Sequence, residues 1–600
     1  MFTVAETLHF EAGEYLFHEG DTENAIYVVL SGRLRALRRT DNQQRILSDI
    51  SAGEPVGELA LFTKEPRSAS VVAIRKSTVL QIDEADYTAL IACYPHFANT
   101  LTQFVIRRVR RDAFQPRMEA APKNVAIVKL QPDFDLTPWT DKIRQQFAAM
   151  EVGIQVYSAE DQLPDNPNAI FDALENGEGM NFIVCDTRHQ AWARQCITYC
   201  DLVLVVADFY APCAVYPIEE QLNLYSSGIL NKKVYLLLLH PENAPMPVNT
   251  RRWFEGRNLH LHLHLRKNNL KDIRRFSRIL TNRAVGLVLG GGGAKGFAHI
   301  GAARAMMQAG IEFDFVGGTS AGALFGAGMT FTDFDDAHLD QICLKGVKRK
   351  VTSNDYHFPF LSLMTGRKMR HHLQDVFGET HLEDIWITTF CVSTNYSNAT
   401  LKVHDTGLVS KQVEASTAIP GVFPPVIIDR HLHVDGGVMD NLPISAMHQK
   451  PVRHVIAIAL SAQSPHLVDI EKAPSAWEIF RNKITKKRRF GLPAMSALLI
   501  NSLTLNSKQK QETSKSQVAL YVEMDLRSFG FLDWSQWKTL IRQGEIQMQN
   551  VLHSLPSGDR FWQKAYPPCE AIQNIEQKTS AGQGFKNLTL RVTGVIAAAI

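Results

Sequence analysis

The sequence predicts a multidomain chain with an N-terminal β-roll, an α/β middle domain and a second, C-terminal α/β domain. Three observations support this prediction. Short β-branched runs separated by glycines fill residues 1–112, which is typical of an antiparallel roll or barrel. Apolar strands alternate with helical patterns over residues 124–280, as they do in a parallel α/β sheet. A strand, a glycine loop, a helix and a further strand follow one another from Ala284, which predicts another parallel unit.

Length and composition are those of an ordinary globular protein. The 600 residues are 45% apolar and 21% charged, with a net charge of +3, so no overall field for nucleic acid is expected. The eight cysteines are scattered without a metal-type CxxC pair, and no metal site is expected. We expect these domains: 1–112, a roll; 113–123, a linker; 124–280, a Rossmann-like domain without a phosphate loop; 284–460, a catalytic domain; 461–600, a helical extension and tail.

The N-terminal residues lack the basic and apolar regions of a signal peptide, and no apolar run reaches 18 residues. We therefore expect a cytoplasmic chain whose membrane contact, if it has one, is peripheral and on the inner face. One candidate contact is the basic Lys483–Arg489, which the apolar-rich stretch 490–500 follows, a pattern that suits an anionic lipid surface or equally a core helix. Another segment, Phe358–Leu361, is expected to form a lid or a groove wall.

The roll carries a candidate anion site. Apolar runs at Ala25–Leu30 and Ser70–Ile74 predict strands, and a helix is predicted over Glu84–Arg111. Between them a glycine turn is followed first by a glutamate, which suits a ribose hydroxyl. An arginine and a serine come later, and their side chains suit a cyclic phosphate. The alternative is a plain turn with a surface Glu–Arg pair. The candidate residues are Gly57, Glu58, Leu59, Arg67 and Ser68.

The middle domain is expected to be a scaffold. Its predicted strands are Val125–Leu130, Phe182–Cys185, Leu202–Ala207 and Val234–Leu239. No glycine-rich loop follows the first of them, where Gln131, Pro132 and Asp133 stand. Three alternating histidines, His260, His262 and His264, place imidazoles on one strand face, and we favour an exposed face over a metal site because no fourth ligand is apparent.

The C-terminal α/β domain opens with the most informative segment of the chain. An apolar run, Ala284–Leu289, stops in Gly290–Gly293, and a helical pattern follows over Ala298–Gln308. A second apolar run, Ile311–Val316, ends in Gly317–Gly322. Both loops should emerge at the carboxyl edge of a parallel sheet.

Ser320 lies at the second of these loops, between small residues that permit a sharp turn and leave its Oγ exposed. The glycine loop offers backbone N–H groups that would stabilise the oxyanion formed when a serine attacks an acyl carbonyl. Gly291, Gly293 and Gly296 also fit a dinucleotide fingerprint. That alternative needs an acidic residue at the end of the next strand, whereas Glu312 and Asp314 stand at its start.

A serine nucleophile needs a base. Asp435 stands before two glycines at the end of a predicted strand, where a carboxylate can point into a cleft. His431 and His433 could instead supply the imidazole of a triad. We favour Asp435 because both histidines precede the glycine turn and lie back along the strand, where they are expected to be half exposed.

These three motifs together resemble the patatin-like phospholipases. The resemblance covers roughly residues 284–447 and implies that Ser320 is the nucleophile and Asp435 the base that activates it directly. The implied oxyanion loop is Gly291, Gly292, Gly293, Ala294, Lys295 and Gly296, the implied elbow is Gly318, Thr319, Ala321 and Gly322 around Ser320, and the implied aspartate motif adds Gly436 and Gly437. Residues Ala418–Pro425 and Asn441–Pro443 resemble further signatures of the family.

The roll similarly resembles cyclic-nucleotide-binding domains over about residues 10–112. This implies Glu58 on the ribose and Arg67 on the phosphate, with Gly57, Leu59 and Ser68 lining the site, for cAMP or cGMP as a regulatory ligand.

The domain order resembles neuropathy target esterase and its bacterial relatives. It implies a serine hydrolase that cleaves carboxylic esters of lysophospholipids and phospholipids through an acyl-enzyme, without a required cofactor and without a nucleic-acid partner. The alternatives are a cyclic-nucleotide-responsive binding protein with a vestigial hydrolase domain, and an acyltransferase.

Overall fold

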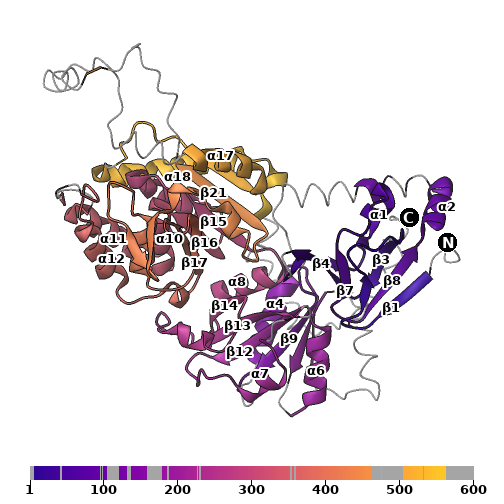
Figure 1. Ribbon diagram of the computed structural model, residues 1–600. Helices are drawn as coiled ribbons and strands as arrows, with labels where there is room; N and C mark the ends of the chain where they lie inside the picture. Colours follow the sequence, from indigo (N-terminus) through magenta and orange to yellow (C-terminus); the bar gives the residue numbers. More distant parts are fainter. Residues whose placement is uncertain are drawn as a thin grey trace. The chain divides into compact units, whose positions relative to one another are not determined.

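The computed structural model divides into two compact units, shown by sequence colour in Figure 1. The first comprises residues up to 245 and 251–283, and the second comprises residues 246–250 and 284–562. The structure describes residues 6–562 except 41–42, 95, 97–98, 100, 104–120, 132–136, 159–173, 175–178, 186–187, 226–227, 229–230, 352–354, 357, 359, 461–473, 476–504 and 532. The predicted basic segment 483–489 with the apolar residues 490–500, the C-terminal tail and most of the predicted linker 113–123 lie outside the described residues.

The N-terminal part is a roll of two four-stranded antiparallel sheets, as predicted. Their strand orders are β1-β8-β3-β6 and β2-β7-β4-β5. Val29, Leu34 and Val79 are fully buried between the sheets, so the apolar residues of the short runs form a core. The strands are β1 (Glu6–Phe10), β2 (Tyr15–Phe17), β3 (Ile26–Ser31), β4 (Arg33–Thr40), β5 (Gln43–Ser51), β6 (Pro55–Val56), β7 (Ser70–Ala73) and β8 (Ser77–Ile82).

The predicted helix Glu84–Arg111 is interrupted at residue 94. Helical backbone resumes at residues 96, 99 and 101–103, and residues 104–111 lie outside the described residues. Helix α2 spans Glu84–Cys93 and starts at Asp83, whose side chain accepts a hydrogen bond from the Asp86 N–H. It ends at Tyr94, which leaves the helical conformation (φ −134°, ψ 77°). Pro95 follows, and a residue before proline disfavours the helical region. The prediction missed this stop signal.

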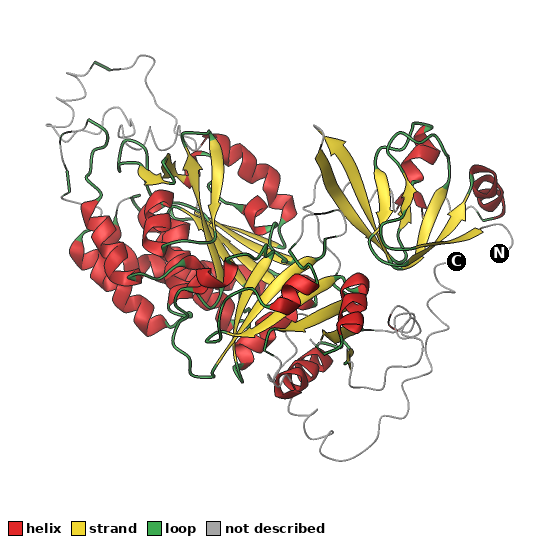
Figure 2. Cartoon of the chain, turned by 60° about the horizontal axis from the view of Figure 1, so that its bottom comes forward, coloured by secondary structure: helices red, strands yellow, loops and turns green. Residues whose placement is uncertain are grey.

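The middle of the chain is the predicted parallel α/β fold. Six parallel strands are ordered β10-β11-β9-β12-β13-β14. Helices (red in Figure 2) pack on these strands (yellow), among them α6, whose Cys196 joins the core under the sheet. The elements are β9 (Asn124–Lys129), α4 (Thr137–Ala149), β10 (Ile154–Tyr157), β11 (Met180–Cys185), α6 (Gln190–Tyr199), β12 (Leu202–Asp208), α7 (Pro217–Gln221), β13 (Lys233–His240), η1 (Thr250–Phe254), β14 (Leu261–Arg266) and α8 (Leu270–Leu280).

The prediction that His260, His262 and His264 form an exposed strand face is wrong for two of the three residues. His260 is exposed, but His262 is half-buried and His264 is buried. Aromatic rings cover this face of β14, since Phe254 lies 4.9 Å from the His262 ring and Phe209 lies 5.9 Å from the His264 ring. Among the described residues no group of three or more His, Cys, Asp or Glu side chains converges as a metal site requires.

A buried ionic cluster connects the roll to the middle domain within the first unit. Asp201, just before β12, lies 3.0 Å from the Arg33 guanidinium and 3.7 Å from that of Arg75. The Asp201 side chain is 3% exposed. It also accepts hydrogen bonds from the N–H groups of Lys123 and Asn124. Both arginines and these N–H groups hold the pKa of Asp201 below its usual value despite burial.

The second unit contains a mixed sheet ordered β19-β20-β17-β16-β15-β21-β22, with β18 paired to β17. Strands β17, β16, β15, β21 and β22 run parallel, whereas β20 lies antiparallel to β17. The strands are β15 (Val285–Leu289), β16 (Phe315–Thr319), β17 (Thr388–Asn395), β18 (Thr400–His404), β19 (Val426–Ile428), β20 (His431–Asp435), β21 (His454–Leu460) and β22 (Leu520–Met524). The helices are α9 (Phe297–Gln308), α10 (Ala321–Phe331), α11 (Asp336–Arg349), α12 (Arg367–Phe377), α13 (Val409–Ser416), α14 (Ile444–Met447), α17 (Leu505–Ser514) and α18 (Trp537–Ser554).

The predicted boundary at residue 460 misses part of this sheet. Strand β22 adds a parallel strand beside β21, and α18 packs along α9. The two helices approach closely at Gly301 and Gly544, where an added Cβ would lie 1.8 Å from the Ile541 carbonyl oxygen and 2.1 Å from that of Ala298. No helix among the described residues has both the length and the apolar character needed to cross a bilayer.

We expect Asp201→Asn to lower the free energy of unfolding by about 3 kcal/mol, because it removes the buried counter-charge of Arg75 and leaves Arg33 with the more distant Asp49, at 3.8 Å. Urea denaturation followed by tryptophan fluorescence measures this loss. The matched control is Asp141→Asn, which removes an exposed ion pair with Arg144 and should change the stability by less than about 1 kcal/mol.

The stabilisation by Asp201 should also depend on pH in a defined direction. Because the pKa of Asp201 is lowered in the folded chain, its stabilisation is present above the pKa of the unfolded aspartate and disappears as the pH falls through the folded value. Equal losses for the two variants at neutral pH would contradict this account.

Candidate active site

Ser320 lies at a strained corner between β16 and α10. Its backbone has φ 53° and ψ −119°, a conformation that costs a non-glycine residue energy and is maintained only by its surroundings. The flanking glycines permit the turn, because a Cβ on Gly318 would lie 2.4 Å from the Gly322 carbonyl carbon and one on Gly322 would lie 2.0 Å from the Leu289 carbonyl oxygen. Ser320 is 7% exposed. This is the geometry of a nucleophile elbow.

The glycine loop after β15 lies directly against this corner. A Cβ on Gly291 would lie 3.0 Å from the Ser320 Cβ. The loop then forms a short 3-10 turn, η2 (Gly293–Gly296), which leads into α9. The parallel pairing of β15 with β16 brings both loops to the same edge of the sheet, as the sequence predicts.

Two of the six residues predicted to form the oxyanion loop already use their N–H groups inside the protein. The Gly291 N–H donates to the Asn441 carbonyl oxygen at 3.2 Å, and the Ala294 N–H donates to that of Phe531 at 2.8 Å. They therefore hold the loop in place instead of facing a ligand. Gly292 and Gly293 stand between them, and the adjacent Lys295 and Gly296 belong to η2.

Asp435, at the end of β20, is brought to the same corner because β20 pairs with β17, next to β16. Its carboxylate lies close enough to Ser320 for the serine hydroxyl to stabilise its charge. The Gly437 N–H donates to Oδ1 of Asp435 at 2.7 Å. The Asp435 backbone is held as well, since its N–H donates to the Ala418 carbonyl and its carbonyl accepts from Thr394 Oγ1. The residue is only 6% exposed.

Burial raises the pKa of Asp435 to about 6, while the hydrogen bonds from Ser320 and Gly437 counteract this rise. The carboxylate is thus mostly ionised at neutral pH but is a stronger base than an exposed aspartate. Such tuning by burial is common among catalytic bases.

Of the two alternative histidines, His431 is half-buried at the start of β20, as expected, and His433 has other partners. His433 is buried, contrary to the expected half exposure, and its Nδ1 lies 2.8 Å from Ser393 Oγ. The same oxygen lies 2.7 Å from His404 Nε2. Burial lowers the pKa of both imidazoles, that of His404 to about 4. His433 therefore supports β17 and β20, and the contact with Ser320 comes from Asp435.

Three residues that sequence reasoning missed, or noted without a role, position the corner. Ser416 Oγ accepts a hydrogen bond from the Ser320 N–H at 3.0 Å and donates to the Val392 carbonyl. His299 is fully buried on α9, and its Nε2 lies 2.8 Å from the Gly290 carbonyl oxygen. Burial lowers the pKa of His299 to about 4, so the neutral ring donates this bond. Asn441 Nδ2 donates to the Gly291 carbonyl at 3.3 Å.

The acidic residue considered for the dinucleotide alternative has a structural contact. Asp314 is fully buried before β16, and its Oδ2 accepts a hydrogen bond from the Val285 N–H at 2.8 Å. It joins the starts of two parallel strands, whereas the glycine loop lies at their ends.

The predicted nucleotide residues gather at one end of the roll. Gly57, in the left-handed region with φ 87°, precedes the short helix α1 (Glu58–Thr63). The Arg67 guanidinium reaches back to this turn, donating to the Gly57 carbonyl at 2.8 Å and to the Ala25 carbonyl at 2.9 Å. It lies 4.2 Å from the centre of the Phe17 ring and is 3% exposed. Glu58 is buried, whereas Leu59 and Ser68 are exposed.

Models of three protein families match successive parts of the chain. They are a cyclic nucleotide-binding domain at residues 7–94, a P-loop like domain of the Neuropathy Target Esterase family at 123–286, and Patatin-like phospholipase at 287–448. A solved structure, the Thermus thermophilus catabolite activator protein, is 28% identical and covers 25% of this chain and 62% of its own, but its TM-score of 0.18 is too low to support a conclusion.

Three relatives extend over most of the chain. Patatin-like phospholipase domain-containing protein ZK370.4 of Caenorhabditis elegans is 26% identical over 92% of this chain and 46% of its own length. Neuropathy target esterase sws of Drosophila melanogaster is 26% identical over 94% and 44%. Lysophospholipase NTE1 of Candida albicans is 27% identical over 76% and 39%. The chain thus spans less than half the length of these relatives. The chain contains the three matched domains in the order given and is similar over most of its length to neuropathy target esterase, which confirms the predicted resemblance.

Proposed function

We propose that the chain is a serine hydrolase that cleaves carboxylic ester bonds of lysophospholipids and phospholipids. The pairing of Ser320, on its strained corner, with the buried carboxylate of Asp435 carries this proposal. The patatin-like domain supports the reaction class, and the name of the fungal relative, a lysophospholipase, supports the substrate class.

The first half of the reaction forms an acyl-enzyme. Asp435 accepts the Ser320 hydroxyl proton while Oγ attacks the ester carbonyl carbon. The N–H groups of Gly292 and Gly293, which lie between the two N–H groups that anchor the loop, stabilise the negative charge on the carbonyl oxygen. The C–O bond of the ester then breaks, and the leaving alcohol takes the proton from Asp435.

The second half releases the fatty acid. Asp435, again ionised, accepts a proton from a water molecule that attacks the acyl-enzyme carbonyl. The bond to Ser320 Oγ breaks, and the proton returns to this oxygen. An acyltransferase would replace the water with another alcohol, so the ratio of free fatty acid to transferred acyl product separates the two reactions.

The cyclic nucleotide-binding domain is proposed to regulate this activity through cAMP or cGMP. Arg67 is the candidate phosphate ligand, but its guanidinium donates to two backbone carbonyls and is almost fully buried. A phosphate must therefore displace these carbonyls, which couples nucleotide binding to a change at the Gly57 turn and α1.

Peripheral contact with a membrane is also proposed, because the substrate resides in one. The predicted lid segment carries exposed apolar side chains in the second unit, with Phe358 72% and Phe360 89% exposed. Exposed aromatic side chains of this kind suit a lipid interface.

The first prediction concerns the nucleophile. A fluorophosphonate probe should label Ser320 of the wild type, and Ser320→Ala should lose both the labelling and at least about 10³-fold in kcat on a lysophospholipid. The exposed Ser554→Ala is the control and should retain both. An unlabelled wild type would favour the vestigial binding protein, and full activity in Ser320→Ala would remove the proposal.

The pKa of about 6 for Asp435 predicts that kcat/KM rises through pH 6 as the base ionises.

Asp435→Asn should abolish this activity but stabilise the fold. A raised pKa means that the folded chain retains the Asp435 proton, so stability falls as the pH rises from the unfolded value to the folded value. At pH 7.5 we expect Asp435→Asn to unfold with a free energy roughly 3 kcal/mol higher. A less stable variant at pH 7.5, or a flat pH profile, would contradict this role.

Calorimetry with cAMP, cGMP and 5′-AMP tests the regulatory proposal. We expect a cyclic nucleotide to bind and to change the kinetics of ester hydrolysis, and linear 5′-AMP, which is the control, to do neither. Absence of binding at millimolar concentration, together with identical kinetics, would refute it.

A further inference from the structure

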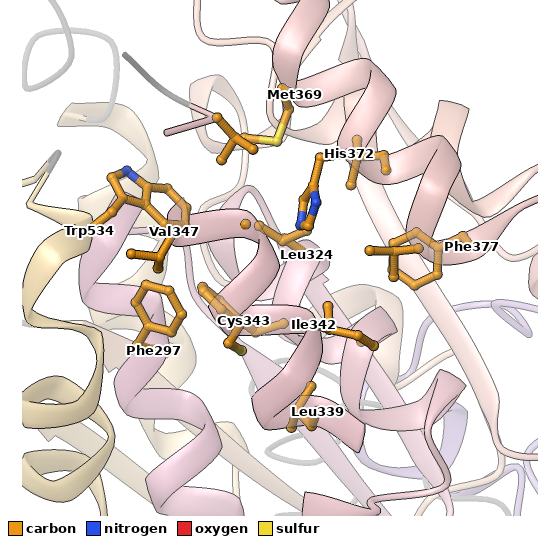
Figure 3. A pocket seen from close by; sticks show the side chains of 16 residues that line it. Phe297, Leu324, Leu339, Ile342, Cys343, Val347, Met369, His372, Phe377 and Trp534 are labelled. Atoms are coloured by element: carbon orange, nitrogen blue, oxygen red, sulfur yellow. The ribbon is translucent and has the colours of Figure 1, made fainter. Parts of the chain in front are cut away.

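An apolar pocket lies beside the Ser320 corner in the second unit. Its walls come from α9, α10, α11 and α12, and Trp534 closes one side (Figure 3). Apart from His372 and the indole N–H of Trp534, the lining side chains are apolar or carry a thiol. The mechanism above gives this space no role, although an ester of a long-chain acid brings an alkyl chain that must leave water.

The walls of the pocket begin where the two catalytic loops end. The Leu324 N–H donates to the Ser320 carbonyl oxygen at 3.1 Å, so Leu324 lies one helical turn after the nucleophile. Phe297 directly follows the glycine loop, and its ring centre lies 4.7 Å from that of Phe325. A Cβ on Gly296 would lie 2.6 Å from Phe325 and 2.7 Å from the Ala321 Cβ. The pocket therefore starts one helical turn from Ser320, behind the contact of the Phe297 and Phe325 rings.

Helix α10 gives the pocket its direction. Leu324 and Gly328 both line it, four and eight residues after Ser320. With a rise of about 1.5 Å per residue, Gly328 lies roughly 12 Å along the helix from the nucleophile. The missing side chain at Gly328 leaves the space open, since a Cβ there would make an ordinary 3.5 Å contact with Leu339.

Two side chains that line this space carry a buried nitrogen without a hydrogen-bond partner among the described residues, Nδ1 of His372 and Nε1 of Trp534. His372 points from α12 toward Leu324 on α10 (Figure 3). It is 7% exposed, and its Nδ1 is buried without a hydrogen-bond partner among the described residues. Its Nε2 edge lies against Gly346, where a Cβ would be 2.9 Å away. Burial lowers its pKa, so the ring is neutral. An unpartnered buried nitrogen is costly, and a bound molecule with a hydrogen-bonding group would remove this cost.

We propose that this pocket holds the acyl chain of the substrate and that His372 makes it favour chains that carry a hydroxyl group over plain alkyl chains. This inference rests on the proposed function. The apolar walls bind the alkyl carbons, and Nδ1 forms a hydrogen bond with the chain hydroxyl. A plain alkyl chain offers no hydrogen-bonding group, so Nδ1 of His372 would stay without a partner.

The first arm tests the location. Gly328→Leu places a side chain in the pocket, while the control Gln341→Leu introduces a leucine on the exposed side of α11. With straight-chain p-nitrophenyl esters, we expect Gly328→Leu to lose at least about 10-fold in kcat/KM for the 16-carbon ester and less than about 2-fold for the 4-carbon ester. Unchanged or parallel losses for the two esters would overturn the location.

The second arm tests His372 with 12-carbon esters that carry one hydroxyl group at successive carbons. The wild type should prefer at least one positional isomer over the plain ester by about 5-fold in kcat/KM, the value of one hydrogen bond. His372→Phe keeps the ring shape and should lose this preference while it retains the plain-chain activity. The control is His371→Phe, at the neighbouring exposed position of α12. A preference that survives in His372→Phe, or none in the wild type, would overturn the role of His372.

A binding arm needs no catalysis. Trp534 lines the pocket, so a brominated free fatty acid should quench fluorescence in the wild type, less in Trp534→Phe and much less in Gly328→Leu. If the 4-carbon ester is not hydrolysed but this quenching occurs, the proposed hydrolase function is wrong while the assignment of the pocket as an acyl-chain site is supported. If the ester is hydrolysed and quenching is absent, the inference fails and the function stands.

Discussion

Asp435 keeps a carboxylate in a buried position, and two neighbouring groups offset part of the cost of its charge. They are the Ser320 hydroxyl and the Gly437 N–H, which donates to Oδ1. The rest of the corner serves this contact. Strand β16 ends at the nucleophile, β17 lies between β16 and β20, and β20 brings the carboxylate back from more than one hundred residues later. A small shift of either strand would leave a buried charge with one partner fewer, which is costly.

The glycines of the corner follow from the same constraint. Gly291 approaches Ser320 so closely that a methyl group at this position would be 3.0 Å from the serine Cβ, and 2.5 Å from Asn441 Oδ1. Gly318 and Gly322 let the chain reverse within a few residues. Backbone contacts of this kind give rigid positions to Ser320 and to the loop N–H groups, as electrostatic stabilisation of an oxyanion requires.

Much of this could be predicted from the sequence, because glycine and strand patterns are local. The roll, the parallel middle sheet and the unit from β15 to Ser320 all have short-range signals. What the sequence did not reveal depends on contacts between distant segments. Ser416 and His299 have no motif around them, yet they hold Ser320 and Gly290. His264 and His433 looked exposed in the strand pattern, and aromatic rings and Ser393 from other elements cover them. Strand β22 was missed because its neighbour β21 lies sixty residues earlier in the chain.

The close contact of α9 with α18 has a consequence for the size of the cooperative unit. Helix α9 starts at the glycine loop, and its Gly301 fits against the backbone of α18 only because neither surface has a side chain there. The segment that the patatin-like model matches stops at residue 448, before β21, β22 and α18. A fragment cut there would expose the backbone edge of β15 and the bare seam of α9, and unpaired strand edges of this kind attract other chains. The described residues after 448 are therefore part of the same fold as Ser320, so the smallest segment able to fold alone is larger than the segment that the family model matches.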